Sequence, residues 1–234
     1  PPFREPILLG KYGAANVRMT GDRRIMVCRP DRVGDVIVSS SCLAPLREAL
    51  PDAVLHFLVP AKLQPLFAGH PFLNSVEVLP DKRVADTRQI EVLTALFHRL
   101  EVNTLIQLQP HPLVERAAWK AGVEQRIGFK RFKRKWLTQA VMYRKHRGEK
   151  HESRYAFELL EKIGVTEPEK DLTPCLHVDP RMKASAMLKL GRRTNGRKFV
   201  TMNLSAHGSK PRIPASYYSA VAHWLVKEHR LDVV

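Results

Sequence analysis

Short apolar runs alternate with longer amphipathic stretches along this chain. Such a run at 24–28 is typical of a buried strand, strands are also expected at 53–59, 103–108 and 125–129, and residues 75–79 alternate between polar and apolar as a strand does. Between them, apolar residues recur at helical spacing, which predicts helices at 86–100 and 112–121, a short one ending near 68, and a helix at the end of the stretch 36–50. Strands that alternate with helices in this way indicate βαβ units and a parallel sheet. We therefore expect an α/β fold whose first five strands complete one doubly wound domain.

The pattern changes after residue 129. A helix is expected at 152–164, followed by a Pro-containing acidic linker at 165–180. A second α/β pattern then begins, with a helix at 181–190, a strand at 198–204, a helix at 215–229 and the start of a strand at 231–234. The predicted organisation is an N-terminal arm (1–20), a Rossmann-like domain (21–164), the linker (165–180) and the start of a second Rossmann-like domain (181–234).

The second domain is expected to be incomplete in this chain. One strand and the first residues of another are too few to form a sheet buried on both faces. The chain also begins with Pro1 instead of Met, which indicates a trimmed or partial sequence.

Composition indicates a globular protein with an anionic partner. The 234 residues are 44% hydrophobic and 26% charged, and 39 Lys and Arg against 23 Asp and Glu give a net charge of +16. No apolar run is long enough to span a membrane, and the N-terminus lacks the apolar core of a signal peptide. The cysteines Cys28, Cys42 and Cys175 have no zinc or disulfide pattern, so we expect small core residues in a reducing cytosol.

The loop from Arg29 to Asp35 directly follows the first strand. In open α/β sheets, ligands bind beside the carboxyl ends of the strands. Gly34 allows a ligand to approach the backbone closely, and Asp35 has the chemistry of a general base. The alternative for Asp35 is a helix N-cap, and Asp31 is a second candidate acid. The loop matches neither the dinucleotide-binding glycine pattern nor a P-loop.

A second candidate loop, at 203–214, follows the strand of the second domain. Ser205 offers a hydroxyl and Lys210 a positive charge for binding phosphate oxygens, and the alternative is an ordinary exposed loop. The histidines show no metal-ligand spacing, so no metal is expected.

A third candidate is the basic stretch at 129–150. It holds nine Lys and Arg against one acid, Glu149, and thus half of the chain's excess positive charge. Aromatic residues lie between the basic ones, a composition that suits nucleic acid, a phosphorylated lipid or an anionic membrane. The alternative is a solvated charged loop.

The order of several segments resembles bacterial lipopolysaccharide heptosyltransferases, glycosyltransferase family nine. The segments are Arg29–Pro51, Phe57–Val59, Gly69–Val78, Ile106–Gln109 and Arg126–Phe129, and the resemblance extends from residue 24 to about 230. The resemblance implies a two-lobed GT-B enzyme that moves heptose from ADP-heptose to the Kdo or heptose inner core of lipid A, with inversion and without a metal or another cofactor. It also implies a cytoplasmic protein peripheral to the inner membrane, with no nucleic-acid partner.

The resemblance assigns roles to individual residues. The family's catalytic aspartate falls on Asp35, and its donor-phosphate loop falls on Ser205 and Lys210, with Gly34 also near the donor phosphate. The anionic lipopolysaccharide acceptor would contact the basic residues Arg32, Lys130, Arg131, Lys133, Arg134 and Lys135.

The sequence departs from the family after Lys210, where Pro-Arg-Ile-Pro214 replaces the usual Arg-Trp-Pro. Two classes of protein remain as alternatives. One is a non-catalytic relative that binds acidic glycolipid, and the other is a nucleic-acid-binding protein, which rests on net charge alone.

Overall fold

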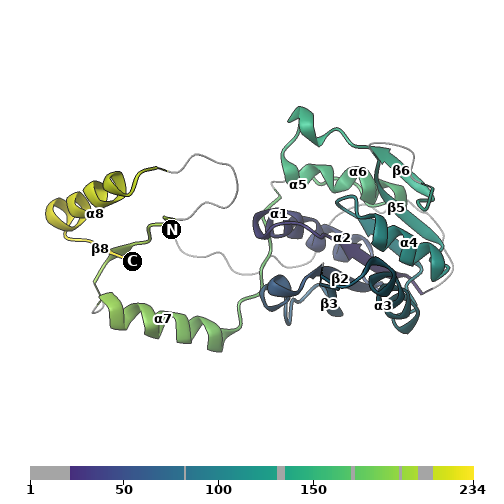
Figure 1. Cartoon of the computed structure of the whole chain (residues 1–234), viewed down its shortest axis with the longest axis horizontal. Helices are drawn as coiled ribbons and strands as arrows, with labels where there is room; N and C mark the ends of the chain where they lie inside the picture. Colours follow the sequence, from purple (N-terminus) through teal and green to yellow (C-terminus); the bar gives the residue numbers. More distant parts are fainter. Residues whose placement is uncertain (1–21, 82, 131–134, 170–171, 195–196, 205–212) are drawn as a thin grey trace. The chain divides into compact units, whose positions relative to one another are not determined.

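The computed structural model describes residues 22–81, 83–130, 135–169, 172–194, 197–204 and 213–234. The chain divides into two units, the first ending at His177 and the second running from Val178 to Val234 (Figure 1). The first unit contains a six-stranded sheet, and the second contains a two-stranded one.

The six-stranded sheet is parallel throughout. Its strands are β1 (Arg24–Cys28), β2 (Val54–Pro60), β3 (Ser75–Leu79), β4 (Thr104–Gln107), β5 (Gln125–Lys130) and β6 (Gln139–Met142). Their order is β3-β2-β1-β4-β5-β6, and each neighbouring pair runs in the same direction. The strand order reverses at β1, as in doubly wound α/β folds, and the predicted fold class is confirmed.

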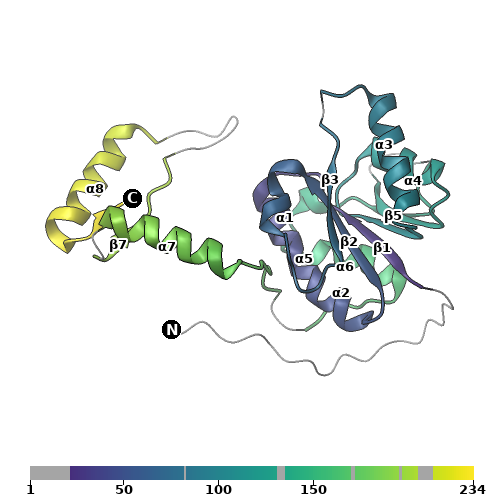
Figure 2. The same ribbon diagram turned by 90° about the horizontal axis from the view of Figure 1, so that it is seen from below.

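Helices cover both faces of this sheet (Figure 2). On one face lie α1 (Val33–Ser39), η1 (Ser40–Cys42), α2 (Leu43–Ala49), α5 (Glu152–Tyr155), α6 (Phe157–Leu160) and η4 (Glu161–Ile163). On the other face lie α3 (Asp86–Arg99) and α4 (Pro112–Lys120). Two further 3-10 turns, η2 (Ala61–Leu66) and η3 (Lys145–Arg147), follow β2 and β6.

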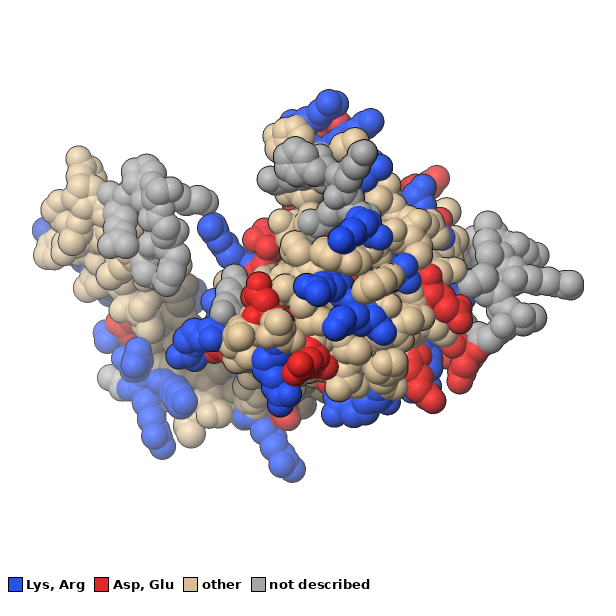
Figure 3. Space-filling view, turned by 45° about the vertical axis from the view of Figure 1, so that its right-hand side comes forward, with Lys and Arg blue, Asp and Glu red and all other residues tan. Residues whose placement is uncertain are grey.

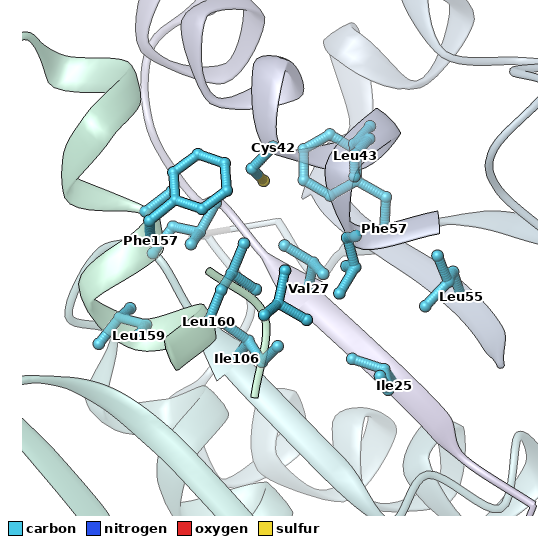
Figure 4. Close-up of a cluster of buried hydrophobic side chains, with 14 of the residues drawn as sticks. Ile25, Val27, Cys42, Leu43, Leu55, Phe57, Ile106, Phe157, Leu159 and Leu160 are labelled. Atoms are coloured by element: carbon cyan, nitrogen blue, oxygen red, sulfur yellow. The ribbon is translucent and has the colours of Figure 1, made fainter. Parts of the chain in front are cut away.

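Two apolar clusters form the core, one on each face. Along β1, Ile25 and Val27 belong to the first cluster, whereas Met26 and Cys28 belong to the second. Figure 4 shows how side chains of β1, β2 and β4 in the first cluster point toward those of η1, α2 and α6. Because both faces are covered, every residue of β1 from Ile25 to Cys28 is apolar and buried.

One sequence prediction about the first unit is wrong. The domain has six strands and not five, because β6 adds to the edge of the sheet next to β5. The helix expected at the end of the stretch 36–50 is α2, and η1 separates it from α1, where the hydroxyls of Ser40 and Ser41 donate to the carbonyls of Ile37 and Val38. Such hydroxyl bonds compete with regular helical hydrogen bonding.

The backbone of Cys175 connects the end of the first unit to Ser40 and His70 by hydrogen bonds. The Cys175 N–H donates to Ser40 Oγ at 3.0 Å, and the Cys175 carbonyl lies 3.1 Å from His70 Nε2. Nδ1 of His70 accepts from the Phe72 N–H, so Nε2 carries the proton and donates to Cys175. Cys28 and Cys42 are buried, whereas the Cys175 thiol is partly exposed.

The second unit is a small βαβ arrangement preceded by a helix. It consists of α7 (Pro180–Thr194), β7 (Phe199–Val200), α8 (Ala215–His229) and β8 (Asp232–Val233), with β7 and β8 parallel. The strand predicted at 198–204 is therefore shorter than expected. Within the described ranges, no helix of either unit is both long and apolar enough to cross a bilayer.

Candidate active site

The carboxyl ends of the six parallel strands meet at one edge of the first unit's sheet. Arg29 follows β1, Leu108 follows β4, and Lys130 ends β5 at this edge. The sequence changes there from buried apolar residues to charged ones. This is the edge at which open α/β sheets bind ligands.

Arg29 is held rigidly at the centre of this edge. Its backbone N–H donates to the Leu58 carbonyl of β2 at 3.0 Å, and its Nη1 donates to the Leu108 carbonyl at 3.1 Å. Its side chain is only 3% exposed. The guanidinium therefore has a fixed position between the ends of β1, β2 and β4.

Three carboxylates surround the Nη2 atom of Arg29. Glu152 Oε1 accepts a hydrogen bond from Nη2 at 3.0 Å, and Asp31 Oδ2 forms an ion pair with it at 3.0 Å. Asp35 Oδ1 lies 4.0 Å away, which is too far for a hydrogen bond. Glu152 comes from the first turn of α5, so the fold brings together charges that are more than 110 residues apart in sequence.

Lys145 completes this charged cluster. Its Nζ donates to Glu152 Oε1 at 2.7 Å and to the Leu108 carbonyl at 3.2 Å, and it lies over the Phe129 ring. Burial lowers the pKa of Lys145, and the nearby positive charge of Arg29 lowers it further. Burial alone would raise the pKa of Glu152, but the hydrogen bonds and charges of Lys145 and Arg29 lower it below the ordinary value.

Asp35 is the most exposed carboxylate of the cluster. It lies in the first turn of α1, and the N-cap of that helix is Arg32, whose side chain makes no capping hydrogen bond. The N-cap alternative for Asp35 is therefore wrong. The Asp35 side chain is 45% exposed, against 25% for Asp31, and burial raises the pKa of Asp31, as does the Asp35 charge.

Gly34 and Arg32 lie beside Asp35 and face solvent. A Cβ added to Gly34 would meet no atom within 4 Å, and its backbone is outside the left-handed region. The fold therefore does not require glycine at this position. The requirement for a close ligand approach remains a prediction.

The remaining predicted site residues do not all lie at this edge. Lys135 stacks its Nζ over the Trp136 ring, and the Trp136 carbonyl accepts from Arg126, near the amino end of β5. Lys130 ends the same strand, at its carboxyl end. The structure thus places Lys130 at the edge that holds Asp35 and Lys135 near the opposite edge. The predicted residues Arg131, Lys133, Arg134, Ser205 and Lys210 lie outside the described residues.

Sequence reasoning missed Arg29, Lys145 and Glu152 as members of the site. The one signal for Arg29 is a charged residue at the carboxyl end of a fully apolar strand. Lys145 is one of nine basic residues in its stretch, and nothing in the sequence distinguishes the buried one. On the face shown in Figure 3, Lys and Arg side chains lie next to Asp and Glu side chains.

The described residues contain no group of three or more His, Cys, Asp and Glu side chains arranged to hold a metal ion. Arg29 and Lys145 both pair with Glu152, and Arg29 also pairs with Asp31. Asp35 is the carboxylate of this edge that is most accessible to a ligand.

The fold and this edge define a doubly wound α/β protein with a cluster of charged side chains at the carboxyl ends of its strands. No model of a known protein family matches the chain, and no curated protein matches it by sequence. Solved structures do. The chain resembles a family 9 glycosyl transferase from Veillonella parvula, with a TM-score of 0.75 and 20% identity over 92% of this chain and 63% of that one.

Two Escherichia coli enzymes are also similar. The ADP-heptose lipopolysaccharide heptosyltransferase II aligns with a TM-score of 0.65 and 21% identity over 88% of this chain and 62% of that one. The heptosyltransferase WaaC, solved with ADP, aligns with a TM-score of 0.65 and 13% identity over 90% of this chain and 65% of that one. The chain thus spans less than two thirds of the length of these structures. The likeness shows the fold, and it agrees with the family resemblance predicted from the motifs.

Proposed function

We propose that this chain is part of an inverting glycosyltransferase that transfers heptose from ADP-heptose to the inner core of lipopolysaccharide. The observation that carries the proposal is the position of Asp35, a partly exposed carboxylate at the ligand-binding edge of the sheet. The neighbours with the same fold include a family 9 glycosyl transferase and two heptosyltransferases, one of them solved with ADP and, in a further structure, with a fluorinated ADP-heptose.

In the proposed mechanism, Asp35 removes the proton of an acceptor hydroxyl. The acceptor oxygen then forms a bond to the anomeric carbon of the heptose, and the bond from that carbon to the diphosphate oxygen breaks on the opposite face. Arg29 Nη2 lies 4.0 Å from Asp35 Oδ1, so the Asp35 oxygens accept no hydrogen bond from it and can accept the proton. The configuration at the anomeric carbon inverts in a single displacement.

The donor is proposed to bind to the second unit. There, β7 and α8 flank the loop that contains Ser205 and Lys210, so this loop connects a strand to a helix. A hydroxyl, a lysine and backbone N–H groups at such a connection would stabilise the charge that develops on the leaving ADP. The reaction then needs no metal ion.

The acceptor is proposed to bind to the first unit near Arg32 and Lys130. Arg32 precedes α1 and is exposed, and Lys130 ends β5 at the same edge of the sheet. Both provide positive charge for the phosphates and carboxylates of an inner-core acceptor. Other basic residues of the 130–147 stretch would hold the protein at an anionic inner-membrane surface on the cytoplasmic side, at about 1 kcal/mol per residue.

The test is release of ADP from ADP-heptose in the presence of a truncated lipopolysaccharide core, using the complete natural protein. Asp35→Asn should lower kcat by about 10²–10⁴-fold, because it removes the general base. The control is Asp86→Asn, since Asp86 also lies in the first turn of a helix, α3, but outside the charged cluster. Full activity of Asp35→Asn, or no ADP release by the unaltered protein, would refute the proposal.

A further inference from the structure

Residues 172–177 form the end of the first unit, and α7 begins shortly after them. They lie within the segment that the sequence predicts to be a linker, and they contain neither helix nor strand. A segment of this kind has no helical or sheet hydrogen bonds, so its position depends on contacts with the rest of the protein. One such contact is made by Leu172, which packs against the apolar cluster that includes Leu160 and Val165.

Cys175 provides two further contacts through its backbone. Its N–H donates to Ser40 Oγ at 3.0 Å, and its carbonyl accepts from His70 Nε2 at 3.1 Å. Ser40 is completely buried, and His70 is 3% exposed. The His70 ring lies next to the rings of Phe67 and Phe72. Close packing therefore holds both partners in place, and together they fix the two backbone polar groups of Cys175.

His177 makes another contact with the first unit. A Cβ built on Gly69 would lie 3.7 Å from Cδ2 of His177, so the His177 ring lies against the turn that precedes His70. The next residue, Val178, is 58% exposed. Asp179 then caps the start of α7, because its Oδ1 accepts from the N–H two residues later at 2.7 Å. Val178 thus lies between a segment bound to the first unit and the capped end of a helix in the second.

We infer that residues 172–177 are a strap bound to the first unit and that the two units are hinged at Val178. Leu172, Cys175 and His177 hold the strap along its length. Its anchor Ser40 directly follows α1, the helix that carries Asp35, so the strap connects that helix to the hinge. This inference goes beyond the proposed function and does not depend on which reaction the protein catalyses.

Backbone order parameters from ¹⁵N relaxation of the full chain test the position of the hinge. The amides of the strap should have values near those of rigid backbone, about 0.85, and the amide of Val178 should have a value below about 0.6. A value below about 0.6 already at Cys175 would overturn the inference, because the strap would then move with the hinge. The measurement needs no variant, so it decides the question even if a substitution impairs folding.

The two serines of η1 offer a matched comparison for the first anchor. Ser40 and Ser41 are both buried, and each donates from Oγ to a carbonyl at 2.7 Å, but it is Ser40 that accepts from the Cys175 N–H. Ser40→Ala should speed hydrogen exchange of the Cys175 amide about fivefold or more, as expected for the loss of one hydrogen bond. Ser41→Ala should leave it unchanged. Unchanged exchange in Ser40→Ala, or equal acceleration in both variants, would overturn the inference.

The second anchor is tested at His70. His70→Gln retains an N–H donor that can reach the Cys175 carbonyl, whereas His70→Leu removes the donor and keeps an apolar side chain there. Lower order parameters in the strap are expected for His70→Leu and not for His70→Gln. Exchange of the β1 amides, which reports on the core, should stay unchanged in both variants. Equal loosening of the strap in the two variants would show that His70 is no hydrogen-bonding anchor.

Discussion

The two units of this protein differ in how far their apolar side chains are buried. In the first unit, Phe57, Leu58 and Phe129 are completely buried between the sheet and its helices. In the second unit, Met187 on α7 and Trp224 on α8 are more than half exposed. Among the described residues, every fully buried large side chain belongs to the first unit. Similar helical spacing of apolar residues therefore gives a closed core in one unit and exposed apolar helix faces in the other.

The comparison shows what a periodic sequence pattern does and does not determine. Spacing decides that a segment becomes a helix and which of its residues lie on one face. Burial of that face depends on a second surface, which the six-stranded sheet provides for α2, α3 and α4. The two-stranded sheet of the second unit leaves every described residue of α8 at least partly exposed. Stability should therefore depend on the first unit far more than on the second.

The largest expected difference between the two units is tested by replacing one large aromatic side chain in each with alanine. Phe57→Ala should lower the free energy of unfolding by about 3–5 kcal/mol, because it removes a ring packed edge-on against Phe67 and leaves a cavity. Trp224→Ala, the matched control, should change it by about 0.5 kcal/mol or less, because that ring is 53% exposed. Urea unfolding followed by circular dichroism measures both. Equal effects would contradict the contrast between the units.

A smaller effect is expected from adding one methyl group to a glycine in each unit. In Gly128→Ala, on β5, the new Cβ would lie 3.3 Å from Leu137 Cδ2 and 3.4 Å from Gln107 Cβ, which should destabilise the protein by about 1–3 kcal/mol. In Gly191→Ala, on α7, the new Cβ meets nothing within 4 Å. Alanine favours helix over glycine by about 0.5–1 kcal/mol.

Thermal unfolding and amide hydrogen exchange measure these two changes. Gly128→Ala should lower the melting temperature, whereas Gly191→Ala should slow exchange within α7. The same sign in both variants would show that the packing of the two units does not differ as described.

The smallest change in the free energy of unfolding is expected when the pH is lowered. Burial lowers the pKa of His56 and of His70, both in the first unit, and in His56 the Nε2 atom is buried without a hydrogen bond. In the unfolded chain these rings take up a proton near pH 6.5, whereas in the folded protein their pKa values are lower. The stability they contribute is therefore complete above about pH 6.5 and declines as the pH falls toward their lower folded values.

Urea unfolding between pH 5 and 7.5 measures this decline. His56→Asn should make the dependence on pH shallower, because it removes one of the two buried rings. His98→Asn is the control, since His98 is exposed on α3. A pH dependence that stays unchanged in His56→Asn would refute the assignment.

Much of the first unit's fold could be predicted from its sequence, and the reason is burial on two faces. The strands 24–28 and 75–79 were predicted at their observed bounds, the first because it is a short apolar run and the second because it alternates between polar and apolar residues. The strand β6 was missed because it is four residues long, only half buried and set within a basic stretch. Its pairing with β5 is a tertiary contact that local pattern does not encode.

The candidate site could be predicted only in part. Asp35 was identified because its loop follows the first strand and resembles a family motif. Glu152 and Lys145 were not, because Glu152 pairs with Arg29, which is more than 110 residues away, and only the parallel sheet brings the three together. Local sequence thus identified the exposed carboxylate and missed the charges that lie beside it.

The attachment of Cys175 also gives the protein one chemically distinct thiol. Burial raises the pKa of Cys28 far above its usual value and that of Cys42 to about 12, so neither forms a thiolate readily. Cys175 is partly exposed and lies two residues before the first unit ends, on backbone tied to Ser40 and His70. Burial raises the pKa of Cys175 too, but its partial exposure should let a thiol-reactive fluorophore modify it before the other two cysteines of this chain.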